Sequence, residues 1–268
     1  MKDGNALLKH VHDTLTRLAH ELAQGHTEAF LDYLKAMGRF HRYSFRNTLL
    51  IWLQKPEATL VAGLRTWNEL GRRVRKGEKG IRILAPVVRR VVEVDEEGKE
   101  VEVEQVVGFR TAVVFDISQT EGQPLPEPPM NRGSEDLFPR LLEACPFRVV
   151  EASLGERHGD TDGQVIRVNR DLPPGEKAAT LLHEWAHALL HFDEAGRGLP
   201  RGVKELEAEA VAYAVGTRLG LEMVGARDYI LSWAGREAQD LLREVLPRLY
   251  RAVEAILGQV EVGKAQAA

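Results

Sequence analysis

The segment TLLHEWAHALLH, at residues 180–191, contains two histidines and a glutamate in the pattern H-E-x-x-H. On a helix, a spacing of four residues places His183 and His187 one above the other on the same face. Two imidazoles placed in this way can ligate one metal ion, and Glu184 beside them can reach a water molecule bound to that ion. The pattern therefore predicts a hydrolytic metal site, although two partly buried histidines on an apolar helix would give the same letters.

A catalytic zinc ion usually has a third protein ligand, and a second segment offers one. The stretch ELEAEAVAYAVGTRLG begins 18 residues after His187 and is rich in alanine and valine, which is typical of a buried helix. Of the carboxylates near its start, Glu205 lies nearest to the apolar face, so we expect it to be the third ligand, with Glu207 and Glu209 as alternatives. Glu205 and Glu209 are four residues apart, so one can ligate while the other orients a histidine.

Helix signals indicate how these residues are positioned. Pro173 and Pro174 suit the first turn of a helix that continues unbroken to His191. A second helix is expected from Arg201 to Gly220, because glycine often follows the last turn of a helix. A further helix is expected from about residue 236.

Two strands are predicted ahead of the metal helix, at 147–152 and 163–169, after a helix at 135–144. This order of elements indicates an α+β architecture for the second half of the chain. The strand at 163–169 directly precedes the metal helix. We therefore expect it to hold a peptide substrate by pairing along its edge.

The first half of the chain has a different composition. Between Gly38 and Arg90 there are 13 Lys and Arg residues against 3 Glu, whereas the whole chain carries a net charge of −4. Aromatic residues are interleaved with these cations. Cations neutralise phosphates and aromatic faces stack on unpaired bases, so the composition predicts a polyanionic partner without naming it.

The densest cluster places five cations within the eight residues 72–79, where they repel one another unless an anion is near. The tryptophans Trp52 and Trp67 are expected in the core instead. The candidate contacts to the polyanion are Arg42, Arg46, Arg72, Arg73, Arg75, Lys76 and Lys79.

The elements expected here are helices within residues 5–37, a helix that begins at about Ser44 and stops before Pro56, and a short helix capped by Thr66. Residues 87–117 alternate valine with charged residues around a turn at DEEGKE, which predicts a long antiparallel hairpin. Four of the twelve prolines lie in residues 118–133, which marks a boundary. We expect an N-terminal domain at 1–118, a linker at 119–133 and a second domain at 134–268.

The overall composition limits the chemistry and the setting. Cys145 is the only cysteine in 268 residues, so no intramolecular disulfide can form and a metal must be held by His, Asp or Glu. No run of about eighteen apolar residues occurs, and the start lacks a signal peptide. We therefore expect a cytoplasmic protein without a membrane partner.

The two metal-site segments resemble the gluzincin arrangement shared by several zincin metallopeptidases, including the ImmA/IrrE type of bacterial regulator. The resemblance implies that His183, His187 and Glu205 are the ligands, that Glu184 is the general base, and that Glu209 orients a ligand. Position 209 departs from the family pattern, because Glu stands there in place of Asp or Asn.

The same resemblance implies hydrolysis of a peptide bond. Zinc acidifies its water, and Glu184 accepts the proton and passes it to the leaving amine. Zn²⁺ is the expected metal, although His/Glu sites accept others such as Mn²⁺. Candidates for a further donor to the oxyanion are His158, His191, Tyr213 and Tyr229.

The first half is similar to the N-terminal domain of ArdC-type antirestriction proteins, through RYSFRNTLLIWLQKPEATLVAGLRTWNELGRRVRKGEKGIRILAPV and the later VFDISQTEGQPLP. These proteins are carried by mobile elements and join such a domain to a zincin-like metallopeptidase domain. The resemblance implies N-terminal helices with an antiparallel hairpin or sheet that bind single-stranded DNA, followed by a zincin-like α+β domain. It also implies protection of incoming DNA from restriction.

Three functions are consistent with these features. The first is a single-stranded DNA-binding antirestriction protein whose zinc peptidase domain cuts an unidentified protein or peptide. The second is a DNA-binding module with a non-catalytic metal. The third is a regulatory protease of the ImmA/IrrE type that cleaves a repressor. Glu184 argues against the second, because a purely structural metal needs no carboxylate beside its ligands.

Overall fold

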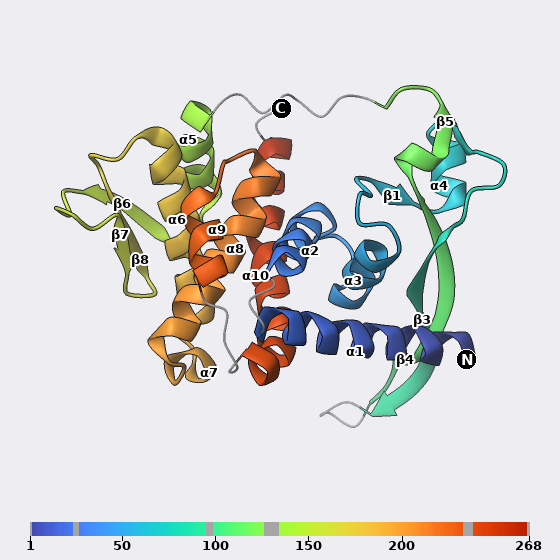
Figure 1. Ribbon diagram of the computed structural model, residues 1–268. Helices are drawn as coiled ribbons and strands as arrows, with labels where there is room; N and C mark the ends of the chain where they lie inside the picture. Colours follow the sequence, from blue (N-terminus) through green and yellow to red (C-terminus); the bar gives the residue numbers. More distant parts are fainter. Residues whose placement is uncertain (1, 24–26, 95–98, 126–133, 233–237, 267–268) are drawn as a thin grey trace. The chain divides into compact units, whose positions relative to one another are not determined.

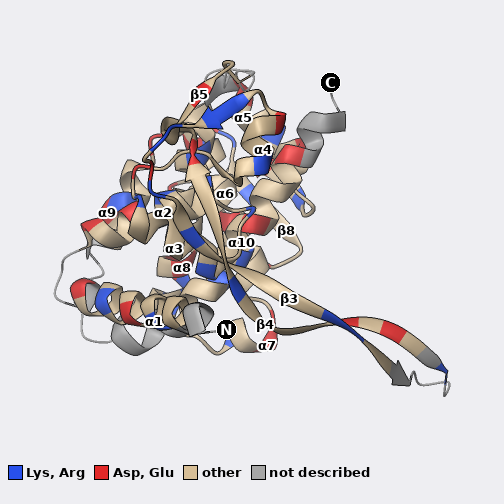
Figure 2. Ribbon diagram, turned by 90° about the vertical axis from the view of Figure 1, so that its right-hand side faces the viewer, with Lys and Arg blue, Asp and Glu red and all other residues tan. Residues whose placement is uncertain are grey.

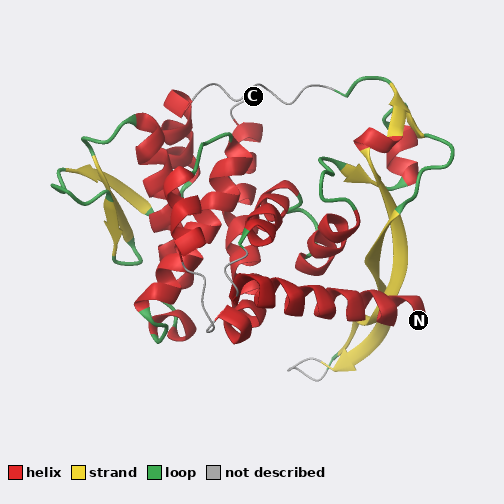
Figure 3. Ribbon diagram, in the orientation of Figure 1, coloured by secondary structure: helices red, strands yellow, loops and turns green. Residues whose placement is uncertain are grey.

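The computed structural model describes residues 2–23, 27–94, 99–125, 134–232 and 238–266 (Figure 1). The chain forms two compact units, the first made of Met1–Thr14 and Arg46–Leu125 and the second of Leu15–Phe45 and Pro126–Ala268. Helices and antiparallel strands occur together, which confirms the predicted α+β class (Figure 3). Residues 15–45 are grouped with the second unit, although we assigned them to the N-terminal domain. The domain limits at 1–118 and 134–268 stay a prediction.

Two long antiparallel strands, β3 (Ile81–Val94) and β4 (Glu100–Asp116), dominate the first unit. They pair from Ile81 opposite Val114 to Val94 opposite Glu100, with one irregularity between Val87 and Val88. Figure 2 shows the two strands twisting about each other and carrying residues of both charges. The predicted hairpin is confirmed, and its turn at 95–98 lies outside the described residues.

The tryptophans of the first unit lie in its core, as expected. Trp67 is completely buried on α4 (Leu64–Glu69), and its indole Nε1 donates to the carbonyl oxygen of Phe115 at 2.9 Å. Trp52 is buried on α3 (Phe45–Gln54). Their rings are therefore not available for stacking on bases.

The start of α4 differs from the prediction. We expected Thr66 to cap this helix, but α4 begins at Leu64 and Gly63 is its N-cap. Glycine is well tolerated at an N-cap because it adopts the extended backbone easily, and Gly63 has a φ of −69° and a ψ of 158°. Thr66 therefore lies inside the helix.

Short strands complete the first unit. Strand β1 (Val61–Ala62) pairs with β4, and β2 (Arg72–Val74) pairs with β5 (Thr120–Gly122), which follows the short helix η1 (Ile117–Gln119). The beginning of the predicted linker is thus a paired strand. Residues 126–133 of that linker lie outside the described residues.

One buried side chain joins α3 to β3. The Asn47 amide nitrogen donates to the carbonyl oxygen of Leu84 at 2.9 Å, and its amide oxygen accepts from the Leu84 backbone nitrogen at 2.8 Å. Asn47 is 8% exposed, so water cannot replace these bonds easily. The side chain thus satisfies both backbone polar groups of one strand residue.

We expect Asn47→Ala to lower the free energy of unfolding by about 2 kcal/mol, because it leaves the two polar groups of Leu84 buried without a partner. Denaturant unfolding of the full chain measures this. The control is Asn68→Ala, at an exposed position of α4, which should change stability by less than about 0.5 kcal/mol. Equal effects of the two substitutions would contradict the assignment.

Helix α8 (Arg201–Leu219) is the centre of the second unit. It packs against α6 (Pro174–Leu190), α2 (Glu28–Arg39), α9 (Val224–Ser232) and α10 (Ala238–Gln266) (Figure 1). Gly38 allows α2 to approach closely, because a Cβ atom there would collide with the backbone of Ala214 on α8. The predicted helices ending at His191 and Gly220 are confirmed. Among the described helices, none is long and apolar enough to cross a membrane.

A three-stranded sheet and α5 (Ser134–Ala144), which packs on α6, lie beside this helical core. The strand order is β6 (Arg148–Ala152), β8 (Val165–Asn169), β7 (Gly159–Thr161). Strand β8 is parallel to β6 and antiparallel to β7. We expected residues 163–169 to pair with a substrate, and this was wrong because both edges of β8 are already paired. Strand β7 is the edge strand next to α6.

Candidate metal centre

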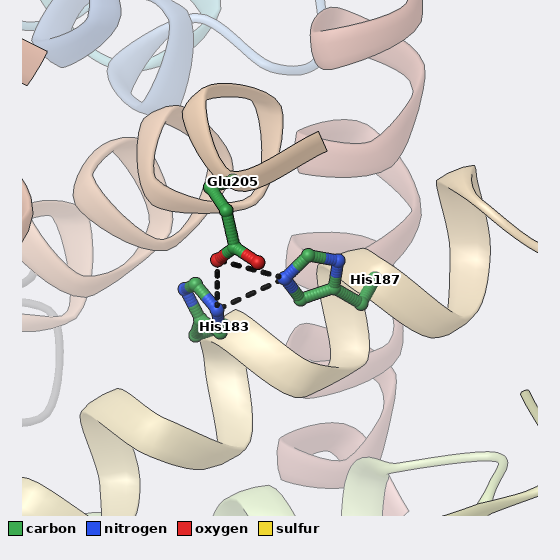
Figure 4. Close-up of side chains that lie close together, drawn as sticks. All are labelled: His183, His187 and Glu205. Carbon is green, nitrogen blue, oxygen red and sulfur yellow. Dashed lines mark hydrogen bonds and ion pairs between the residues drawn. The ribbon is translucent and has the colours of Figure 1, made fainter. Parts of the chain in front are cut away.

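Three side chains from α6 and α8 converge on one point. His183 and His187 come from α6, and Glu205 comes from the first turns of α8 (Figure 4). The Nε2 atoms of the two imidazoles are 3.0 Å apart, and Glu205 Oε2 is 3.5 Å from each of them. Each residue thus offers one ligand atom within 4.8 Å of the others. The set of two imidazoles and one carboxylate is the kind that binds Zn²⁺ and related divalent cations.

The two histidines are held in different ways. His183 Nδ1 lies 3.3 Å from Glu209 Oε1, so a carboxylate holds this ring directly. His187 Nδ1 lies 2.8 Å from His191 Nδ1 instead. Glu207, which we considered as an alternative ligand, is fully buried behind the cluster and contacts His191. The position of Glu209 suits the orienting role that we expected for it, and that role stays a prediction.

The protonation of the metal-free cluster follows from these contacts. Burial opposes a charge on His183, but its hydrogen bonds to Glu205 and Glu209 raise its pKa to about 10. Burial and the neighbouring charge of His183 lower the pKa of His187 to about 3. The hydrogen bond with His183 lowers the pKa of Glu205 to about 2. One proton is therefore shared by the cluster, because two imidazolium rings cannot approach so closely.

Glu184 lies beside the cluster and is 8% exposed. Burial raises its pKa to about 7, and the nearby carboxylates Asp160, Glu205 and Glu209 act in the same direction. A carboxyl group with a pKa near neutrality can both accept and release a proton under ordinary conditions. These properties suit the general base that we expected at Glu184, and that role stays a prediction.

A cleft of about 1080 Å³ opens above these residues. Its walls come from β7, α6, the start of α8 and the start of α9, and both histidines, Glu184 and Glu205 line it. Gly159 allows β7 to lie against α6, because a Cβ atom there would approach Thr180 Cγ2 to 2.7 Å and Glu184 Cγ to 3.0 Å. The edge of a strand is thus placed along the cleft.

The structure separates the four candidates for a further oxyanion donor. His158 and His191 both line the cleft, but His191 is only 4% exposed and its Nε2 is held by Glu207. Tyr213 is buried near Lys35 and is not among the cleft residues. Burial and the charges of Glu205 and Glu209 raise the pKa of Tyr229. Neither tyrosine is among the cleft residues, so His158 is the candidate whose exposed ring lines the cleft, and the role itself stays a prediction.

The predicted polyanion contacts do not form one surface of free cations. Arg72 holds β5, with bonds to Thr120 Oγ1 at 2.8 Å and to the backbone of Gln123. Arg75 pairs with Glu78 at 2.8 Å and donates to the Ser118 carbonyl at 2.5 Å. These two guanidinium groups support the loop that they belong to.

The other candidates differ in their surroundings. Arg42 belongs to the second unit and pairs with Glu261 at 2.6 Å, while Arg46 lies over the ring of Phe109. Arg73, Lys76 and Lys79 are exposed in the first unit, and within the described part of the chain their side chains have no hydrogen bond or ion pair.

Sequence reasoning did not identify β7 or the buried chain formed by His191, Glu207 and Arg248. Strand β7 has three residues and no alternating pattern, so no sequence signal indicated it. His191 carried a signal, since it lies four residues after His187 and therefore on the same face of α6. The ligand pattern H-E-x-x-H ends before it, and the sequence alone did not show what it contacts.

Comparison with known proteins matches two parts of the chain to two different family models. Residues 8–115 match the model of the N-terminal domain of anti-restriction factor ArdC, and residues 145–216 match the IrrE N-terminal-like domain. An uncharacterized protein of Bacillus anthracis is 27% identical over 261 residues. That match covers 80% of this chain, and the chain spans 44% of the length of this curated relative.

Crystal structures of the antirestriction ArdC protein from the R388 plasmid are also similar. The Mn(II)-bound structure is 20% identical, with a TM-score of 0.52, and the match covers 94% of this chain and 97% of that one. The metal-free structure is 23% identical, with a TM-score of 0.48 and coverage of 82% and 85%.

The fold and the site define a two-part protein, with a metallopeptidase-like second part that carries a His/Glu cluster. The match to the ArdC N-terminal domain ahead of it supports the ArdC-type assignment.

We expect the cluster to release about one proton for each divalent cation that it binds near neutral pH. The raised pKa of His183 means that the metal-free site is protonated below about pH 10. A cation must displace this proton. Its apparent affinity should therefore increase about tenfold for each unit by which the pH is raised, up to about pH 10. Calorimetry with Zn²⁺ in two buffers of different ionisation enthalpy measures the released proton.

His158→Gln is the matched control, because His158 lines the same cleft but lies outside the cluster. It should leave the proton release unchanged, whereas His183→Ala should abolish the binding. Binding of Zn²⁺ to the unaltered protein without proton release would contradict the assignment.

Proposed function

We propose that this protein joins a single-stranded DNA-binding unit to a metal-dependent peptidase and acts in antirestriction. The observation that carries the proposal is the convergence of His183, His187 and Glu205 beside a buried carboxyl group in an open cleft. The family assignment supports the link to DNA, because the first half matches the ArdC N-terminal domain.

In this proposal His183, His187 and Glu205 hold a divalent cation. Zn²⁺ fits the donor set, and Mn²⁺ is the alternative, because the related R388 protein was crystallised with Mn(II). When bound, such a cation supplies Lewis acidity to a carbonyl group and acidifies a water molecule. The open cleft beside the three residues leaves room for a substrate, which a purely structural site does not need.

The peptidase residues of the chain itself have separate roles in this proposal. Glu184 accepts the proton of the attacking water and delivers it to the leaving amine, for which its pKa of about 7 is suited. The unpaired edge of β7, which lines the cleft, binds an extended peptide through backbone hydrogen bonds. Asp160 on this strand is fixed by Arg167 at 2.6 Å and Arg157 at 3.0 Å, which keeps the edge in place.

The DNA-binding surface that we propose contains fewer residues than the seven cations predicted from the sequence. Arg73, Lys76 and Lys79 are exposed, and no described residue pairs with their charges, so they can contact phosphates at little cost. Arg72 and Arg75 stabilise the loop that presents them. We therefore assign phosphate binding to the first three residues and a supporting role to the other two.

Glu184→Gln should bind Zn²⁺ as the unaltered protein does but lose peptide hydrolysis by about 100-fold or more, because it removes the proton acceptor and keeps the shape. Cleavage of a randomised peptide mixture, followed by mass spectrometry with and without single-stranded DNA, measures the loss. Glu176→Gln is the matched control, since Glu176 lies on the same helix and lines the same cleft. Unchanged cleavage by Glu184→Gln would remove the general base from the proposal.

Replacing Arg73, Lys76 and Lys79 together by glutamine should weaken binding of a single-stranded oligonucleotide. It should also lower the number of counterions released on binding, given by the slope of log affinity against log salt concentration, by about two to three. Fluorescence anisotropy over a range of salt concentrations measures both quantities. A triple variant of Arg65, Arg89 and Arg90 removes the same charge from exposed positions of the same unit. If the two triple variants lose equal affinity, the effect belongs to net charge and not to the loop.

A further inference from the structure

A buried chain of polar side chains leads away from His187. His191 Nδ1 lies 2.8 Å from His187 Nδ1, and His191 Nε2 lies 2.8 Å from Glu207 Oε2. Arg248 of α10 lies 3.4 Å from the same carboxylate oxygen and donates to the Leu190 carbonyl at 2.8 Å. Thus α6, α8 and α10 each contribute to one connected set of hydrogen bonds and an ion pair.

The chain is screened from water. Glu207 is 0% exposed and His191 is 4% exposed. A buried carboxylate is stable only when its charge is balanced, and the Arg248 guanidinium provides that balance. With its charge compensated by Arg248, Glu207 does not require a positive charge on His191.

The directions of these hydrogen bonds follow from what each group can donate. An ionised carboxylate only accepts, so His191 Nε2 must donate to Glu207. An imidazole that donates through Nε2 alone has its other nitrogen free to accept, so His191 Nδ1 is the acceptor toward His187. His187 Nδ1 must then donate to it, and the lone pair of His187 lies on Nε2, the atom that faces His183 and Glu205.

We propose that His191 is a positioning residue that, held by Glu207 and Arg248, fixes His187 in the tautomer whose Nε2 can bind a metal. The proposal rests on the metal site of the proposed function and adds how that site is prepared. His183 is oriented by the carboxylate of Glu209 directly, whereas His187 is oriented through a second imidazole. Partners that fix a ligand histidine in this way raise metal affinity, because the ring does not have to reorganise.

Nuclear magnetic resonance of the metal-free full chain tests the tautomer without any change in the site. Long-range proton–nitrogen spectra distinguish an imidazole protonated on Nδ1 from one protonated on Nε2. His187→Ala identifies the His187 signals by their loss. We expect the Nδ1–H form of His187 in the unaltered protein, and the Nε2–H form would overturn the proposal.

Substitution of His191 tests the effect on metal binding. His191→Leu removes the acceptor and should weaken Zn²⁺ binding by about 10- to 100-fold in competition with a chromophoric chelator. His191→Asn places an amide oxygen near the position of Nδ1 and should recover most of the affinity. Thermal unfolding in excess chelator shows whether each variant folds. If the Zn²⁺ affinities of the two variants parallel their thermal stabilities, and do not depend on whether an acceptor is present at position 191, the proposal is overturned.

The failure of this proposal and the failure of the metal site are distinguishable. If the unaltered protein binds Zn²⁺ and His183→Ala does not, the site stands. If His191→Leu then binds Zn²⁺ as tightly as the unaltered protein, the positioning role is refuted and the site remains. If the unaltered protein does not bind Zn²⁺, the proposed function fails, and this proposal fails with it.

Discussion

The close packing of α6 against α8 is the constraint on which the site depends. The candidate ligands come from two helices that are separate in sequence, and their ligand atoms meet only if the helix axes are held at a fixed distance. The alanine-rich face of α8 permits this, because Ala208 and Ala212 are completely buried and have no bulk to separate the helices. The polar cluster is thus a consequence of apolar packing, which also supplies the burial that raises the pKa of Glu184.

The sequence predicted well what regular spacing controls. Two signals predicted the cluster: His183 and His187 are four residues apart, and Glu205 lies nearest to the apolar face of its helix. The structure brings these three residues together. The long hairpin followed from its alternation of valine and charge. Sequence reasoning failed where pairing partners decide the outcome, as for β8, because strand order within a sheet is set by contacts that no local pattern records.

The basic loop illustrates a second limit of sequence reasoning. Composition counts Arg72, Arg73 and Arg75 as equivalent charges, yet the strand pairing of β2 with β5 turns Arg72 inward to backbone acceptors and leaves Arg73 exposed. Side chains alternate along a strand, so neighbouring cations inevitably acquire different surroundings. A cluster of cationic residues in a sequence therefore indicates that a polyanion binds there, but it does not identify which of those residues contact the polyanion.

The contact of Arg248 with Glu207 makes the last helix part of the metallopeptidase-like unit. The region that matches the IrrE N-terminal-like domain stops at residue 216, before α10 begins. A chain shortened to that region would keep every candidate ligand but would lose the guanidinium that balances Glu207 and the helix that packs on α8. The smallest self-sufficient form of this unit is therefore larger than its recognisable motif, and the C-terminal helix belongs to its folding core.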